Sequence, residues 1–252
     1  MIKSSTVKRD LQYLEISSDG ARHTSKGSVA IEHTLTIFVN GNPWVTLFCS
    51  PSDLTELALG FLESEGVLKD MGEVEDIVER QGNVWLKLKG QVQSPAHAIT
   101  SGGGRSSLRE LDLDPVPLSE RVKATRILEL ARRFEDSSEV WKVTHGVHSA
   151  ALSDTREILV FREDLGRHNA VDKVFGHCLM KGSSPRGLFL FLSGRISSEM
   201  VLKAARRKVP LIASLASPTD KALELAQRLN ITVVGSARDE RMRVYTVPRR
   251  IL

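Results

Sequence analysis

Seven side chains that can bind or ionise crowd into residues 163–173. They are Glu163, Asp164, Arg167, His168, Asn169, Asp172 and Lys173. An apolar run ends just before them at Phe161, and an apolar helical face follows from Val171. This pattern predicts a strand, a turn at Gly166 and then a helix. Unpaired N–H groups and a positive dipole at the start of the helix favour an anionic ligand. The same composition would also fit a solvent-exposed first helical turn that binds no ligand, with ion pairs between side chains four residues apart.

Small, hydroxyl and arginine residues recur at the ends of the later predicted strands. The groups are Ser193-Gly194-Arg195, then Ser214 followed by Ser217-Pro218-Thr219, then Gly235-Ser236-Ala237-Arg238. The carboxyl ends of parallel strands lie along one edge of a sheet, where ligands bind. Hydroxyls and arginines there can bind phosphate, and glycine lets a ligand approach the backbone. The edge therefore favours a phosphate-bearing or nucleotide-like ligand. Ser217, Pro218 and Asp220 also fit an ordinary helix start with Ser217 as the N-cap.

Two histidines and two cysteines complete the candidates for chemistry. His145 and His148 could bind a metal, but no further ligand lies near them in the sequence, and His148 fits better at the ligand edge or as a buried polar group. Cys49 lies between a predicted strand and a helix start, so it could be a stabilised thiolate or a structural residue. Cys178 lies on an apolar helix face, as a core residue would. The absence of Cys-x-x-Cys and His-x-Glu excludes a zinc deaminase site.

The elements that position these groups follow from periodicity and turn signals. In the N-terminal part we expect strands over 34–39, 44–48, 74–78 and 84–88, with a helix between Asp53 and Gly66. Residues 1–30 are polar and expected to be loose. Residues 91–117 contain three consecutive glycines and form a long loop, which is typical of a functional or disordered segment. A helix is expected from Ser119 to Phe134.

The C-terminal half alternates between strands and helices. Strands are expected over 148–152, 158–161, 188–192, 211–215, 232–234 and 244–246, and helices over 167–180, 197–207 and 218–229. This alternation predicts a mostly parallel sheet covered by helices. We therefore expect two domains. Residues 1–117 would form a smaller α+β domain, and residues 118–252 a three-layer α/β domain.

Composition narrows the class of protein. The chain has 252 residues, of which 41% are hydrophobic and 26% charged, as in ordinary globular proteins. No apolar run could span a membrane and no secretory signal begins the chain, so a cytoplasmic protein is expected. The net charge of +4 favours anionic partners. Nucleic-acid binding is not expected, since aromatic residues make up only 5% and the basic residues are scattered.

Several segments together resemble the formate dehydrogenase accessory sulfurtransferase family, known as FdhD. The matching stretches are NG…CSPSDLTELALGFLESEGVL (40–68), THGVHSAAL (144–152), EDLGRHNAVDKVFG (163–176), SGRISSEMVLKAA (193–205), LIASLASPTDKALELAQ (211–227) and VGSARDERMRVYT (234–246). The resemblance covers nearly the whole chain from about residue 30. It implies a deaminase-like α/β fold with an appended smaller domain.

The resemblance also implies a function, a cargo and partners. The family carries sulfur from a cysteine desulfurase to the molybdenum bis(molybdopterin guanine dinucleotide) cofactor before its insertion into the formate dehydrogenase apoenzyme. A homodimer is compatible with the open strand edges of such a sheet. The implied cofactor-binding residues are His148, Asp164, Arg167, His168, Asn169, Asp172, Lys173, Ser193, Gly194, Arg195, Ser214, Ser217, Pro218, Thr219, Gly235, Ser236, Ala237, Arg238, Asp239, Glu240 and Arg241.

The chain departs from the family at the sulfur-carrying cysteine. That cysteine sits in a loop matching residues 99–106, and its position here is Gly103. A persulfide requires a thiolate. Either Cys49 substitutes, or sulfur passes without a covalent carrier, or this chain only binds and protects the cofactor as a non-catalytic chaperone.

Overall fold

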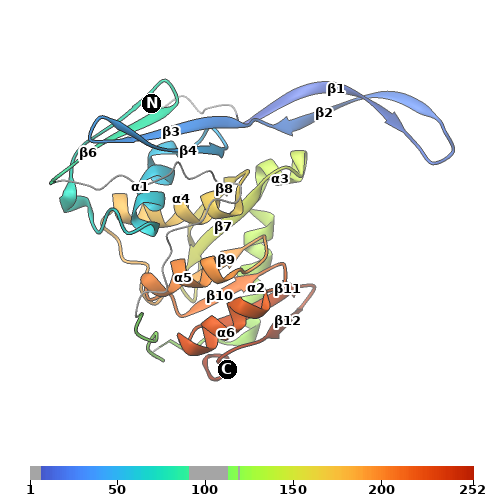
Figure 1. Cartoon of the computed structure of the whole chain (residues 1–252). Coiled ribbons are helices and arrows are strands. Elements are labelled where there is room, and N and C mark those ends of the chain that lie inside the picture. Colours follow the sequence, from blue (N-terminus) through green and yellow to red (C-terminus); the bar gives the residue numbers. More distant parts are fainter. Residues whose placement is uncertain (1–6, 91–112, 119) are drawn as a thin grey trace.

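The computed structural model describes residues 7–90, 113–118 and 120–252 (Figure 1). Most of the predicted loop over 91–117, including Gly103, lies outside the described residues. Two sheets carry separate apolar cores, and a two-stranded hairpin stands apart from both.

The smaller sheet contains β3 (His33–Val39), β4 (Asn42–Cys49), β5 (Val74–Arg80) and β6 (Asn83–Leu88) in the order β4-β3-β6-β5. Burial alternates along β3, so every second side chain faces inward. Helix α1 (Leu54–Ser64) covers that inner face with Leu57, Ala58 and Leu62. A short helical turn, η1 (Met71–Glu73), leads into β5. These four strands and the helix match the predicted positions to within a few residues.

The expectation that residues 1–30 are loose is wrong for the described part. β1 (Lys8–Ile16) and β2 (Arg22–Ala30) form an antiparallel hairpin of nine residue pairs. Figure 1 shows it reaching out from the body as a long ribbon, and we call it the arm. A two-stranded ribbon encloses no core, so its sequence is mostly polar and resembles a loop.

The larger sheet has six strands in the order β12-β11-β10-β9-β7-β8. They are β7 (His148–Ser153), β8 (Ile158–Asp164), β9 (Phe189–Leu192), β10 (Leu211–Ser214), β11 (Thr232–Arg238) and β12 (Arg241–Val244). The prediction of a mostly parallel sheet is correct only for β9, β10 and β11. β7 pairs antiparallel with both β8 and β9, and β12 pairs antiparallel with β11, so the sheet is mixed. The short turns after β7 and β11 return the chain as hairpins, which cannot give parallel neighbours.

Helices cover both faces of the larger sheet, giving the predicted three-layer α/β arrangement (Figure 1). α4 (Arg167–Met180), α5 (Ser198–Arg206) and α6 (Asp220–Arg228) pack on one face. α2 (Ala124–Asp136) packs on the other through Ile127, Leu130 and Phe134. Two short helices, α3 (Glu139–Thr144) and η2 (Pro248–Arg250), complete the chain.

The two sheets are joined where α1 crosses α4. Gly60 of α1 and Gly176 of α4 lie at the crossing, and neither helix leaves room there for a Cβ atom on the other. Around the crossing, the Glu56 carboxylate accepts hydrogen bonds from Arg162 and lies 2.8 Å from His177 Nδ1. α4 therefore packs on the core of both sheets. None of the described helices is long and apolar enough to cross a membrane.

Candidate functional site

The predicted ligand edge exists at one end of the larger sheet. β8, β9 and β10 end there, and β7 begins there because it runs antiparallel to its neighbours. His148 at the start of β7 is therefore the register partner of Asp164 at the end of β8. An isolated bridge between Ile196 and Pro218 links the turns that follow β9 and β10. Segments that are far apart in the sequence meet at this edge.

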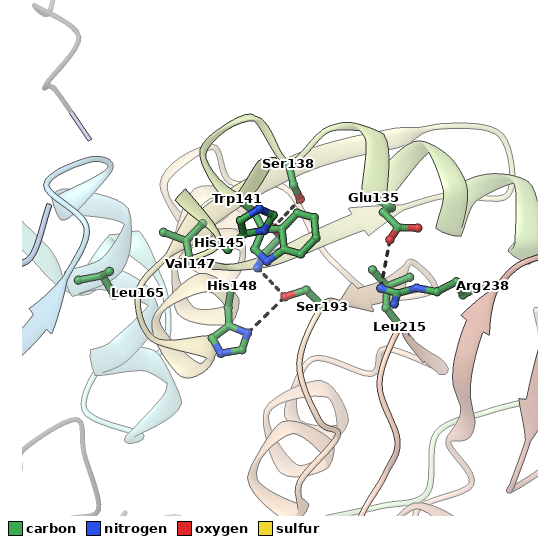
Figure 2. Close-up of a pocket in the computed structure, with 12 residues that line it drawn as sticks. Glu135, Ser138, Trp141, His145, Val147, His148, Leu165, Ser193, Leu215 and Arg238 are labelled. Atoms are coloured by element: carbon green, nitrogen blue, oxygen red, sulfur yellow. Dashed lines mark hydrogen bonds and ion pairs between the residues drawn. The ribbon is translucent and has the colours of Figure 1, made fainter. Parts of the chain in front are cut away.

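A cavity of about 330 Å³ opens at this edge, which is within the size range of small-molecule sites (Figure 2). Its lining residues come from α2, α3 and the segments flanking α3, from β7, from the turns after β8, β9 and β10, and from the end of β11. They are Glu135, Ser138, Trp141, His145, Gly146, Val147, His148, Ser149, Leu165, Ser193, Leu215 and Arg238.

His148 and Ser193 line one side of this cavity, and Gly194 follows Ser193 in the turn after β9. Ser193 Oγ accepts a hydrogen bond from the Ser149 backbone N–H at 2.8 Å and lies 3.4 Å from His148 Nδ1 (Figure 2). A Cβ atom at Gly194 would lie 3.1 Å from His148 Nδ1 and 3.6 Å from Arg167 Cβ. A glycine at this position therefore lets the turn after β9 lie directly against the histidine and the start of α4.

The region around His148 is electropositive. Burial lowers the pKa of His148 below its ordinary value, and the positive charges of Arg167 and Arg195 lower it further. Arg167 Nε and Ser197 Oγ are buried without a hydrogen-bond partner among the described residues. Arg167 begins α4, and Ser197 is the N-cap position of α5. The start of α4, with the unused Arg167 donor, therefore lies beside a neutral histidine, and the start of α5, with the unused Ser197 hydroxyl, follows the turn after β9. Such an environment is suited to an anionic group.

His168 extends this region along α4. Its Nδ1 lies 3.1 Å from Glu199 Oε2 on α5. A carboxylate alone would favour the charged ring, but burial, with the charges of Lys203 and Arg167, lowers the pKa of His168 to about 3. The close approach of His168 and Glu199 links the start of α4 to α5.

The side chains of Asp164, Asn169 and Lys173 are buried and do not line the cavity. Asp164 Oδ2 and Lys173 Nζ form an ion pair at 2.6 Å, and both side chains are fully buried. Asp164 also accepts hydrogen bonds from the Ser50 backbone N–H and from Asn169 Nδ2. Asn169 Nδ2 donates further to the Phe48 carbonyl. These three residues therefore hold the turn between β4 and α1 against the start of α4, and we assign them a structural role.

Asp172 is buried in the same helix. Its carboxylate lies 2.5 Å from Lys203 Nζ on α5 and accepts a hydrogen bond from Ser64 Oγ on α1 at 2.7 Å. Burial raises the pKa of Asp172, while Lys203 and Ser64 act in the opposite direction. The residue links three helices, so we assign it a structural role as well.

The residues after β10 hold the turns of the edge together. Ser214 Oγ donates to the Gly194 carbonyl at 2.7 Å. Thr219 is the N-cap of α6 and accepts from the Ala222 N–H, so the expected N-cap at Ser217 is corrected by two residues. Ser217 is exposed and Pro218 half-buried in the turn that precedes the cap.

The residues around the β11–β12 turn line a second cavity. Gly235 lies against the Ala216 carbonyl, where a Cβ would approach to 3.0 Å, and the Ser236 N–H donates to the same carbonyl. The second cavity, of about 640 Å³, lies between this turn and α2. Its lining includes Ala237, Arg238, Asp239 and Glu240, and Arg241 is exposed beyond the turn.

One ion pair separates the two cavities. Arg238 Nη2 lies 3.1 Å from Glu135 Oε1, and both residues line both cavities (Figure 2). Two partly exposed, oppositely charged side chains therefore form the wall between them.

Both cysteines are buried. Cys49 lies at the end of β4 in the smaller core, where burial raises the pKa of its thiol to about 12. Burial also raises the pKa of Cys178 on α4. Cys49 is therefore a protonated thiol and not a stabilised thiolate. The nearby helix start does not offset the loss of hydration that burial imposes on the charged form.

Several lining residues were missed from the sequence, among them Glu135, Ser138 and Trp141. Trp141 lies on α3, and its ring meets that of His145 edge-on at 4.8 Å between centroids. Glu163 positions this short helix by accepting hydrogen bonds from its first backbone N–H groups, including that of Trp141. The spacing of Trp141 and His145 by four residues was the only signal that they share one face.

No group of three potential metal ligands occurs among the described residues, so His145 and His148 find no third ligand there.

The model of the FdhD/NarQ family matches residues 30–252. The sulfur carrier protein FdhD of Bacillus subtilis (strain 168) is 39% identical over 232 residues, covering 87% of this chain and 88% of that protein. The protein of the same name from Staphylococcus aureus (strain MRSA252) is 36% identical and covers 93% of both chains.

A solved structure shares the fold. The crystal structure of a formate dehydrogenase accessory protein from Desulfotalea psychrophila superposes with a TM-score of 0.84 at 31% sequence identity. The match covers 98% of this chain and all of the other. The mixed sheet and its covering helices are therefore an arrangement found in an experimental structure.

Proposed function

Because this chain belongs to the FdhD/NarQ family, we propose that it binds the bis(molybdopterin guanine dinucleotide) form of the molybdenum cofactor as cargo. In this role it holds the cargo while sulfur from a cysteine desulfurase is added to it. It then releases the cargo to the formate dehydrogenase apoenzyme.

The observation that carries this proposal is a pair of unused donors at the ligand edge, of which Arg167 is a neighbour of His148. Arg167 Nε and Ser197 Oγ are buried, have no partner among the described residues and stand at two helix starts. Buried donors that find no partner are costly, and a phosphate oxygen would relieve that cost. Arg195 adds an exposed positive charge at the same edge. The cargo carries phosphates at both of its nucleotide ends, so this region fits its chemistry.

A second candidate function is supported by the cysteines. Sulfur transfer through a persulfide needs an accessible thiolate. The chain has two cysteines, and both are buried with raised thiol pKa values. These facts favour a cofactor-holding chaperone in which sulfur does not become covalently attached to this chain.

Calorimetric titration with guanosine diphosphate, which mimics one end of the cargo, tests the shared binding step. We expect saturable binding, and we expect Arg167→Ala and Arg195→Ala each to weaken it by about tenfold, since each removes a charge-assisted phosphate contact. Arg80→Ala is the matched control because Arg80 stacks over Trp85 on the smaller sheet. An absence of binding to both the nucleotide and the intact cofactor, or an equal loss in the control, would exclude this site.

A further inference from the structure

A third cavity, of about 190 Å³, lies where the turn between β4 and α1 meets β8 and α3. The turn contributes Ser50, Ser52 and Asp53 to its lining, and β8 contributes its residues 161–163. Of all the lining residues, only Val147 also lines the cavity at the ligand edge. The third cavity is therefore separate from the region assigned to the cargo.

Ser50 places a hydroxyl at this cavity that has no partner among the residues that the structure describes. The residue is only 3% exposed, and its Oγ is buried. Its backbone is held on both sides, because its N–H donates to Asp164 Oδ2 at 3.0 Å and its carbonyl accepts from the Ser52 N–H at 2.8 Å. Buried polar groups are normally hydrogen-bonded. The unused hydroxyl therefore indicates that a polar group enters the cavity.

Two carboxylates line the same cavity. Glu163 accepts the Val140 and Trp141 N–H groups, each at 3.1 Å, and burial raises the pKa of its carboxyl. A carboxylate has about four lone-pair positions, so Glu163 can accept a further donor. Asp53 begins α1 without capping it, and its Oδ1 lies 3.6 Å from Arg162 Nε. Within the described part of the chain, neither carboxylate has a cation at hydrogen-bond distance.

The arginine that lines the cavity is committed to other groups. Arg162 Nε and Nη2 donate to the two carboxylate oxygens of Glu56 at 2.6 and 2.8 Å. Its Nη1 donates to the Phe161 carbonyl at 2.7 Å. Because Glu56 neutralises this guanidinium, the Asp53 and Glu163 carboxylates leave an excess of negative charge at the cavity. An anion is therefore disfavoured there, and a cation is favoured.

The rest of the lining decides which kind of cation fits. It is apolar and consists of Val7, Val140, Val147 and Phe161. These side chains offer no oxygen ligands, and no group of three potential metal-binding side chains occurs in the described ranges. A hard metal ion takes about six or more oxygen ligands, so it is poorly served here. An organic cation with an apolar part matches both halves of the lining.

We propose that the third cavity binds a small primary amine with a short alkyl chain. A primary ammonium group carries three N–H donors. They match three acceptors of the cavity, namely Ser50 Oγ and the carboxylates of Asp53 and Glu163. The alkyl chain lies against the apolar part of the lining, where its burial is favourable. This site does not depend on the function proposed above.

Calorimetric titration of the full chain with n-butylammonium, in a buffer that contains no amine, tests the proposal. We expect one molecule to bind per chain with a Kd of about 1 mM, which is within reach of so small a ligand. n-Butanol and butyrate keep the alkyl chain but replace the ammonium group. Each should bind at least about tenfold more weakly, because the carboxylates then gain no cation.

Two variants test the polar contacts. Ser50→Ala removes one acceptor and Asp53→Asn removes one charge, so each should raise the Kd for n-butylammonium by about tenfold. Asparagine tolerates the left-handed backbone of Asp53, whose φ is +53°. Ser153→Ala is the matched control, since Ser153 Oγ is also buried without a partner among the described residues but does not line the cavity. Its Kd should equal that of the wild type, and urea unfolding checks that all three variants remain folded.

Several results would overturn the proposal. One is the absence of binding at about 50 mM n-butylammonium. Another is equal affinity for n-butanol, because the cavity would then recognise only the alkyl chain. A Kd unchanged in both Ser50→Ala and Asp53→Asn would place the amine elsewhere, as would an equal loss in Ser153→Ala. Displacement of the amine by an equal concentration of potassium ions would identify an inorganic cation site instead.

Discussion

Gly60 of α1 and Gly176 of α4 lie so close together that a Cβ atom on either would come within 2.9 Å of the backbone nitrogen of the other. A Cβ atom on Gly60 would lie 1.9 Å from the Asp172 carbonyl oxygen, and one on Gly176 would lie 1.8 Å from the Glu56 carbonyl oxygen. Both obstructions are backbone atoms, so neither can move away as a flexible side chain could. The two helices approach this closely only because both positions are glycine.

Adding a methyl group at the crossing should therefore destabilise the whole chain. We expect Gly60→Ala and Gly176→Ala each to lower the free energy of unfolding by on the order of 3 kcal/mol or more, because the helices must separate. Urea unfolding followed by circular dichroism measures this. Gly41→Ala is the control, since Gly41 has nothing near its Cβ direction and only its φ of +82° opposes the change, at about 1 kcal/mol. Equal losses at Gly60 and Gly41 would contradict the close crossing.

Removing the positive partner of Asp164 should also be costly. Lys173→Met leaves the Asp164 carboxylate buried without its cation, and we expect a loss of about 3–5 kcal/mol in unfolding free energy. Adding Asp164→Asn removes the stranded charge, so the double variant should recover part of that loss. Urea midpoints of the two variants give the comparison. If the double variant is less stable than Lys173→Met alone, the interior ion pair is not the reason for the loss.

Nucleotide binding should depend on pH through His148. Burial and the two neighbouring arginines lower its pKa, so the free protein holds this ring neutral at pH 7. A bound phosphate would favour the protonated ring and raise that pKa, so binding should take up a proton and tighten as the pH falls from about 7.5 to 6. Calorimetry in buffers of different ionisation enthalpy measures the proton uptake. The uptake should fall in His148→Asn, and an unchanged value there would mean that another group titrates.

Sulfur loading separates the two candidate functions. In a covalent transfer, a thiolate of this chain attacks the outer sulfur of the desulfurase persulfide, forms a new S–S bond and releases the desulfurase thiolate. Because both thiols are buried with raised pKa values, we expect the folded chain incubated with a cysteine desulfurase and cysteine to gain no adduct of about 32 daltons by intact mass. An adduct that disappears in Cys49→Ala would instead assign the carrier role to Cys49.

The sequence predicted those elements whose signals are local. The helix over 167–180 is confirmed at both ends, because a continuous apolar face begins after Gly166 and runs to Leu179. The arm was missed because its alternation encloses no core. The short helix α3 was missed because six residues are too few to show a period, although Trp141 on it lines the cavity.

The candidate site was only partly predictable for a different reason. His148, Ser193 and Gly194 come together because β7 lies antiparallel between β8 and β9, and strand order is not written in any one segment. Asp164 and Asp172 were predicted to bind the ligand. The sequence does not show whether a charged side chain near a helix start points outward to a ligand or inward to the core. The direction depends on the ion-pair and hydrogen-bond partners of the side chain, and those of Asp172 are 31 and 108 residues away in the sequence.

The close crossing of α1 and α4 also bears on the order in which the chain can fold during synthesis. The Ser64–Asp172 contact beside the crossing spans 108 residues, so α1 leaves the ribosome long before the helix that will cover it exists. At about 5–20 residues per second, this interval lasts roughly 5–20 seconds. Throughout it, the glycine face of α1 is open to other chains. The nascent polypeptide should therefore depend on chaperones until α4 has been translated, even though the finished protein buries that face completely.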